Sequence, residues 1–195
     1  MTAVEALRAG GLVVLPTDTV YGVCALATDE DAVRALATLK GRDPAKPIAL
    51  VGADVDTLLS LVPELPEPLL RTLLPGAYTL VLPNPARRFP TLAGSRPETL
   101  GVRVPVFAGE ATEVMRVVGA VGATSANPSG GREPRSVEEL DPQIRAGVAS
   151  IVDGGELPGT PSTVLDLTSD DPVVLREGAV PAAEALARAR EAQSG

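Results

Sequence analysis

The stretch Gly11–Val23 reads GLVVLPTDTVYGV and sets three polar residues between two apolar runs. The apolar run from Gly11 to Leu15 predicts a short buried strand, which we expect Pro16 to end because proline has no N–H to donate to a sheet. A second strand is predicted from Val20 to Ala25. The polar segment Thr17–Thr19 between them has two interpretations. It is either a turn capped by its own side chains or one wall of a polar pocket set into an apolar core.

The composition predicts one globular domain. The chain has 195 residues, of which 45% are hydrophobic, and this is enough to bury a full core. Aromatic residues make up only 2% and tryptophan is absent, so the core must consist of leucine, valine and alanine, and few rings are available to stack on bases. The net charge of −8 argues against a general affinity for nucleic acid or anionic membranes, although a local basic groove stays possible.

Several classes of protein are disfavoured by what the sequence lacks. The chain has no histidine, which excludes Ser-His-Asp and Cys-His catalysis and most zinc sites. Its one cysteine, Cys24, lies in an apolar run, so there is no disulfide framework, and we interpret this residue as a small packed hydrophobe rather than a reactive thiol. No apolar run approaches 18 residues and no secretion signal is evident, so we expect no transmembrane helix and a cytoplasmic protein.

The order of the predicted elements favours a mixed sheet. Predicted strands outnumber helices and do not alternate strictly with them, which indicates a single α/β domain with a twisted mixed sheet flanked by helices. We expect residues 1–180 to form the functional unit and residues 181–195 to add a terminal helix and tail to the same domain. Neither a GxxxxGK[S/T] loop nor a strand-borne GxGxxG motif occurs. The predicted strands are 13–15, 20–25, 48–51, 78–82, 100–104, 121–123, 151–153, 163–167 and 173–176. The predicted helical segments are 2–9, one that begins at 28–29 and leads to Lys40, 55–62, 68–74, 109–118, a turn at 137–140, and 182–192.

Polar side chains gather at the ends of four predicted elements. The four stretches are Thr17–Thr19, Lys40-x-Arg42, Ser125-x-Asn127, and Ser162-Thr163 together with Arg176. Each has an ordinary structural interpretation, since cations suit a helix C-terminus and Ser-Ala-Asn-Pro is typical of a capped turn. Together they offer cations, hydroxyls and an amide, which is the inventory of a site that holds phosphates and a small zwitterion.

The combination of these motifs resembles the YrdC-type threonylcarbamoyl-AMP synthases, in their short, single-domain form. The matching motifs are PTDTVYG, K-x-R at Lys40 and Arg42, SAN at 125–127, STV at 162–164 and R-x-G at Arg176 and Gly178. The resemblance spans about residues 4–180. It implies a large concave groove and a nucleotidyltransferase that converts L-threonine, bicarbonate and ATP to threonylcarbamoyl-AMP and pyrophosphate. This is the first step in making N6-threonylcarbamoyladenosine in tRNA.

The resemblance also implies roles for individual residues. Lys40 and Arg42 would be catalytic. Those expected at threonine are Thr19, Arg103 and Ser162. Those expected at ATP are Lys40, Arg42, Lys46, Thr99, Ala123, Ser125, Asn127 and Arg176. The chain departs from the family pattern at Val51, where many relatives carry a histidine that contacts threonine.

Magnesium is expected to enter with ATP, held mainly by phosphates and water, and no protein ligand is assigned to it. The expected partners are the three substrates and the downstream tRNA threonylcarbamoyl transferase machinery.

Two other functions stay open. One is a non-catalytic RNA-binding module, and the other is a domain of a carbamoyl-transfer enzyme. In the first case, five arginines in predicted loops would line the same groove and follow phosphates. They are Arg87, Arg88, Arg96, Arg132 and Arg135.

Overall fold

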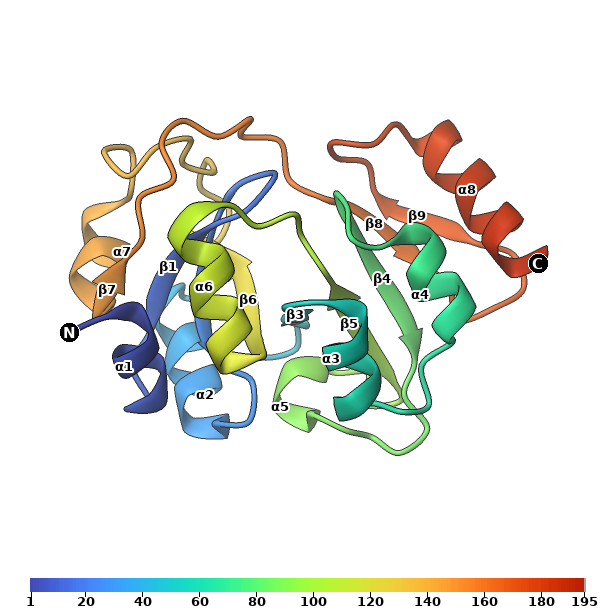
Figure 1. The fold of residues 1–195 in the computed structure, drawn as a ribbon, viewed down its shortest axis with the longest axis horizontal. Helices are drawn as coiled ribbons and strands as arrows, with labels where there is room; N and C mark the ends of the chain where they lie inside the picture. Colours follow the sequence, from blue (N-terminus) through green and yellow to red (C-terminus); the bar gives the residue numbers. More distant parts are fainter. Residues whose placement is uncertain (195) are drawn as a thin grey trace.

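The computed structural model describes residues 1–194 and shows a single α/β domain (Figure 1). The residue that ends the predicted 181–195 tail, Gly195, lies outside the described part. The strands are β1 (Val13–Pro16), β2 (Tyr21–Leu26), β3 (Ala49–Gly52), β4 (Tyr78–Pro83), β5 (Thr99–Arg103), β6 (Ala120–Ser125), β7 (Ser150–Ile151), β8 (Thr163–Asp166) and β9 (Val173–Arg176). The helices are α1 (Ala3–Arg8), α2 (Glu30–Leu39), α3 (Val55–Leu61), α4 (Glu67–Leu73), α5 (Pro90–Ala93), α6 (Gly109–Val118), α7 (Pro142–Gly147) and α8 (Ala182–Ser194).

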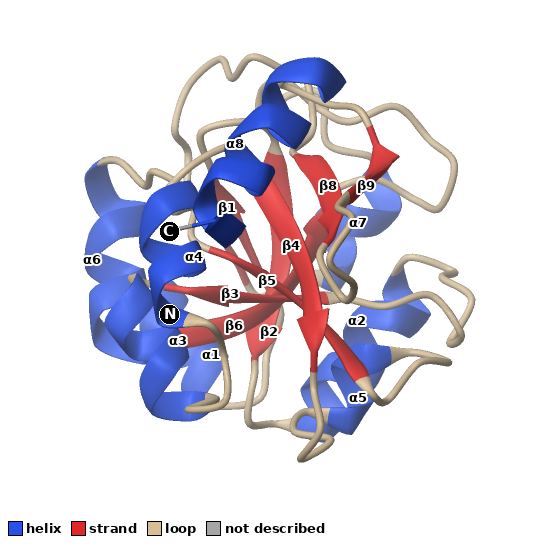
Figure 2. Ribbon diagram, turned by 90° about the vertical axis from the view of Figure 1, so that its right-hand side faces the viewer, coloured by secondary structure: helices blue, strands red, loops and turns tan. Residues whose placement is uncertain are grey.

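All the described strands join one mixed sheet in the order β7-β1-β2-β6-β3-β5-β4-β8-β9. The pairs β1–β7, β3–β5 and β4–β8 are parallel, and the other neighbours are antiparallel. The sheet is strongly twisted, with helices packed around it (Figure 2). The sequence-based expectation of a mixed sheet flanked by helices is therefore confirmed.

Local sequence explains where most elements begin. Thr2 and Glu5 form a reciprocal capping box at α1, and the Asp29 side chain accepts a hydrogen bond from Ala32 N at the start of α2. Strand β1 ends at Pro16, as expected, and Pro16 pairs with Tyr21 at this last position, where its missing N–H is tolerated.

Two helices were missed in the sequence. The turn predicted at 137–140 is present, closed by a hydrogen bond from Leu140 N to the carbonyl of Val137 at 3.2 Å, but no helix forms there. Helix α7 starts two residues later, capped by Asp141 with Pro142 in its first turn. The short helix α5 lies within the segment 84–98 that the sequence predicts as a loop.

Helices cover the two faces of the sheet differently. A Cβ at Gly122 would meet Leu92 of α5 and Val33 of α2, so these two helices cover the face toward which Gly122 points. The neighbouring residues of β6 point to the opposite face, because side chains alternate along a strand. There, Val121 packs in a second hydrophobic cluster with residues of α1 and α6. Helices α1 and α6 therefore cover part of that second face, and the rest of it carries the site described next.

Candidate functional site

A cavity of about 330 Å³ lies on this second face. Its floor consists of alternate residues from neighbouring strands, and many of them are small. The small floor residues are Gly22, Ala49, Gly101 and Ala123. The absence of larger side chains at these positions leaves room above the sheet for a ligand.

The walls of the cavity differ from end to end. An apolar part is formed by Leu15, Cys24, Val51 and Val121, which also belong to the hydrophobic cluster under α1 and α6. Burial raises the pKa of the Cys24 thiol to about 12, so this cysteine is an inert packed side chain. This agrees with the interpretation made from the sequence.

Four arginines also line the cavity, namely Arg42, Arg96, Arg103 and Arg176. Burial lowers the pKa of Arg42, Arg103 and Arg176, and the charge of Arg176 lowers the pKa of the other two further. The cavity is therefore a concentrated positive site in a protein of net charge −8, and it suits an anionic ligand.

The Thr17–Thr19 turn contains both features that its sequence suggested. The Thr17 hydroxyl accepts hydrogen bonds from the backbone N–H groups of Thr19 and Val20 and donates to the carbonyl of Val20 at 2.7 Å, which caps the turn. Asp18 and Thr19 instead accept hydrogen bonds from Nη2 of Arg103, at 2.5 and 2.8 Å. The turn is thus both capped and part of the site.

Arg103 and Val51 lie side by side at the ends of parallel strands, where β3 and β5 place them in register. Both line the cavity. The Nε atom of Arg103 is buried and has no hydrogen-bond partner among the described residues. A buried donor without an acceptor is costly, so a ligand that supplies an acceptor here is favoured.

Lys40 is buried behind the end of β6. Its Nζ donates to the carbonyl oxygen of Ser125 and lies 3.4 Å from both Ser125 Oγ and Asn127 Oδ1. Ser125 Oγ in turn donates to Asn127 Oδ1 at 2.5 Å. Burial, together with the charge of Arg42, lowers the pKa of Lys40 to about 8. The Ser-Ala-Asn segment is therefore tied to the Lys-x-Arg segment through Lys40.

Two further contacts shape the cavity mouth. Arg42 donates from Nη2 to the carbonyl of Pro47 at 2.6 Å, which holds the loop after α2. Arg176 donates from Nη2 to the carbonyl of Ser162 at 2.8 Å, and Ser162 Oγ lies 2.8 Å from Thr79 Oγ1.

The structure brings most of the predicted site residues to this cavity. Those that line it are Arg42, Thr99, Arg103, Ala123, Ser125, Ser162 and Arg176. Thr19, Lys40 and Asn127 lie directly behind this lining and are hydrogen-bonded to it. Lys46 is exposed on the following loop, outside the lining residues.

Sequence reasoning missed Thr79 at the site, considered Arg96 only as an RNA contact, and gave Asp18 no role. Thr79 interrupts an apolar strand, and its position between buried Tyr78 and Leu80 is the signal that it faces the other side. Arg96 lines the cavity and contacts Asp166 at 3.3 Å. Asp18 belongs to the polar turn 17–19, but the motif implies no role for it.

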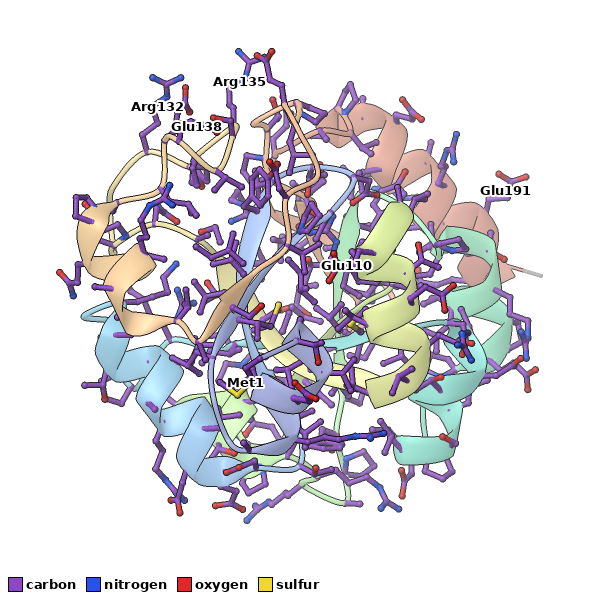
Figure 3. The ribbon with its side chains drawn as sticks, turned by 60° about the vertical axis from the view of Figure 1, so that its left-hand side comes forward. Met1, Glu110, Arg132, Arg135, Glu138 and Glu191 are labelled. Carbon is purple, nitrogen blue, oxygen red and sulfur yellow. The ribbon has the colours of Figure 1, made fainter. Side chains whose placement is uncertain are left out.

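The five arginines considered for RNA binding do not share one groove. Among them, only Arg96 lines the cavity. Arg88 pairs with Glu64 at 2.8 Å and Arg135 pairs with Glu156 at 2.9 Å. Figure 3 shows Arg132 and Arg135 pointing outward near Glu138, before α7. The expectation that these arginines line the groove is therefore wrong for the other four.

Within residues 1–194 there is no group of three or more histidine, cysteine, aspartate or glutamate side chains placed to hold a metal ion. None of the helices in that range is both long and apolar enough to cross a membrane.

Comparison with known proteins identifies the family. Residues 5–178 match the model of the Sua5/YciO/YrdC family, which is described as telomere recombination. The threonylcarbamoyl-AMP synthase of Pyrococcus abyssi is 36% identical over 182 residues, which is 91% of this chain and 53% of that protein. The crystal structure of Pyrococcus abyssi Sua5 complexed with L-threonine has a TM-score of 0.82 at 35% identity and covers 95% of this chain and 56% of its own. The crystal structure of Escherichia coli YciO has a TM-score of 0.76 at 29% identity, and the match covers 91% of this chain and 87% of YciO. Because the family model matches residues 5–178, which is most of a chain that also folds like these relatives, the chain belongs to the Sua5/YciO/YrdC family.

Proposed function

We propose that the protein is an L-threonylcarbamoyladenylate synthase, a nucleotidyltransferase that serves N6-threonylcarbamoyladenosine formation in tRNA. The observation that carries the proposal is one cavity with two polar groups around it. The first is Arg103 and Ser162 in the lining with Thr19 behind them, and the second is Arg42, Arg176 and Ser125 in the lining with Lys40 behind them. The first group suits the carboxylate and hydroxyl of a small amino acid, and the second suits phosphates. The Pyrococcus relative named for this activity, and its structure with bound threonine, support the same assignment.

The chemistry needs little proton transfer from the protein. The amine of threonine attacks bicarbonate or its CO2 form, which yields a carbamate and, from bicarbonate, water. A carbamate oxygen then attacks the α-phosphorus of ATP, and pyrophosphate leaves. Both steps depend on holding the reactants together and neutralising phosphate charge, so a chain without histidine is equipped for them.

Within this scheme each cluster has a task. Arg103 binds the threonine carboxylate, and the hydroxyls of Thr19 and Ser162 complete the amino-acid end. Arg42, Arg176 and Lys40 bind the phosphates and stabilise the charge that develops on the leaving pyrophosphate. Lys46, Thr99, Ala123, Ser125 and Asn127 are proposed as further nucleotide contacts, of which Lys46 would have to swing in from its exposed loop.

Magnesium fits this scheme as a companion of ATP. The described residues provide no three-ligand cluster for a metal ion, and Mg²⁺ commonly binds through substrate phosphates and water with few protein ligands. When bound, it would add further charge neutralisation at the phosphates.

Pyrophosphate release tests the proposal. The purified protein is incubated with ATP and Mg²⁺, with and without threonine and bicarbonate, and the nucleotide product is identified by mass spectrometry. We expect pyrophosphate and threonylcarbamoyl-AMP only when threonine and bicarbonate are both present. Pyrophosphate formed without threonine would contradict the proposal. A protein that binds RNA but releases no pyrophosphate would support the RNA-binding alternative instead.

A further inference from the structure

We propose that Asp18 is a positioning residue for the amino-acid end of the cavity, and that its carboxylate holds Arg103 in the orientation in which Arg103 receives a ligand carboxylate. This inference rests on the proposed function for the identity of the ligand. It assigns a role to the one residue of the Thr-Asp-Thr turn that neither the motif nor the turn geometry explains.

Asp18 is not what makes the turn. Thr17 supplies the hydrogen bonds that close it, to the N–H groups of Thr19 and Val20 and to the Val20 carbonyl. The Asp18 carboxylate takes no part in these bonds. Its contact is with Arg103, 85 residues further along the chain, at 2.5 Å. An interaction that connects the β1–β2 turn to the end of β5 serves the cavity and not the local fold.

The hydrogen bonds leave Arg103 fixed but available. Asp18 Oδ1 and Thr19 Oγ1 both accept from the same nitrogen, Nη2, and so use both of its protons. Nε is buried and has no partner among residues 1–194. One nitrogen of Arg103 is therefore anchored to the turn, while its Nε keeps an unused donor and the side chain lines the cavity.

Electrostatics gives a second reason for the pair. The side chain of Arg103 is only 9% exposed and that of Asp18 is 18% exposed. Burial and the nearby charge of Arg176 act against the charged form of Arg103, and Asp18 acts for it. Without Asp18 the guanidinium would be a buried, unpaired cation repelled by another arginine of the same cavity, and we expect it to leave its position.

A role for Asp18 as a competitor of the ligand predicts the opposite change in threonine affinity. If Asp18 merely occupied Arg103 in competition with the ligand, its removal would tighten threonine binding. If Asp18 positions Arg103, its removal weakens binding, because an arginine that must first be ordered binds less tightly than one already in place.

The first experiment needs no substrate. Nitrogen-resolved NMR of arginine side chains, with Arg103 assigned from the signal missing in Arg103→Lys, compares the wild type with Asp18→Asn. We expect the guanidinium protons of Arg103 to exchange with water about tenfold or more faster in Asp18→Asn, because a charge-assisted bond is lost. Unchanged exchange would overturn the proposal. Asp18→Glu, which keeps the charge, should recover part of the protection and provides the same test if Asp18→Asn does not fold.

The second experiment measures ligands by calorimetry. Threonine should bind Asp18→Asn about tenfold or more weakly than it binds the wild type. The affinity for α,β-methylene-ATP should change less than about twofold, because the other end of the cavity would hold this ligand. The control is Asp31→Asn, which removes an exposed partner of Arg34 at 2.8 Å and should change neither affinity. An equal loss of affinity for both ligands, or a higher affinity for threonine, would overturn the positioning role. If the wild type binds no threonine, the proposed function fails, and the exchange rates of Arg103 still decide the role of Asp18.

Discussion

Replacing Arg42 by lysine tests the phosphate end of the cavity most directly. Arg42 lines the cavity, follows the end of α2, and donates to the carbonyl of Pro47 at 2.6 Å. The planar guanidinium can hold that carbonyl and still present other N–H groups to phosphate oxygens, whereas an ammonium offers a point charge. The loss of one charge-assisted hydrogen bond costs about 1.5–3 kcal/mol, so kcat/KM for ATP should fall by about 10- to 100-fold.

The structure also predicts how the stability of Arg42→Lys should change. The bond to Pro47 has a charged donor but lies at an exposed position, where water can replace it, so we expect its loss to cost about 1 kcal/mol. Tm should then fall by no more than about 4 °C. Steady-state kinetics of pyrophosphate release and a thermal melt provide the two measurements. The control is Arg34→Lys on the preceding helix, where Arg34 is exposed and pairs with Glu30 and Asp31. If the two variants give the same kcat/KM for ATP, Arg42 only holds the loop and its assignment to phosphate is wrong.

Three further predictions concern the two ends of the cavity. The pKa of Lys40 is lowered to about 8, so its charge is present below that pH and is lost above it. Thus kcat/KM for ATP should fall as pH rises through about 8, and Lys40→Arg should move this fall to higher pH; a profile that is flat from pH 7 to 9 would contradict the role of Lys40. Val51 lies in register with Arg103, so Val51→His should change the KM for threonine more than the KM for ATP, and the reverse order would place Val51 away from the amino acid. Because the apolar wall can receive a methyl group, threonine should be preferred over serine by about 10- to 200-fold in kcat/KM, and equal turnover of glycine and threonine would refute this pocket assignment.

The parts of the fold that the sequence predicts well are those specified by local patterns. Apolar runs and caps locate most strands and helices, and α6 and β9 match their predicted ranges. The order of strands is not a local property. Nothing near residues 49–52 indicates that β3 inserts between β6 and β5, because that place depends on contacts with segments far along the chain.

In the candidate site, too, local motifs predict some residues, whereas others depend on contacts between distant segments. Residues such as Arg103 and Ser125 could be assigned to the site from the sequence, because they lie in segments that resemble the motifs of the family. Thr79 could not, since its role depends on which face of β4 it occupies and on a hydroxyl from another strand, at Ser162. The motif predicts Lys46 beside Lys40 and Arg42 at ATP, but Lys46 is exposed on the loop after α2.

The parallel pairs at both sides of the sheet have a consequence for how the chain reaches its folded state. Strand β1 pairs with β7 only after more than 130 residues of intervening chain, and β4 pairs with β8 only after the 79 residues 84–162. Such non-local pairing closes long loops, and the chain loses conformational entropy before the new contacts can compensate for that loss. Folding is therefore slow. During synthesis the N-terminal strands therefore emerge well before their last partners. We expect the cavity to form late, after β8 has left the ribosome, so that nascent chains that end before residue 160 bind neither threonine nor ATP.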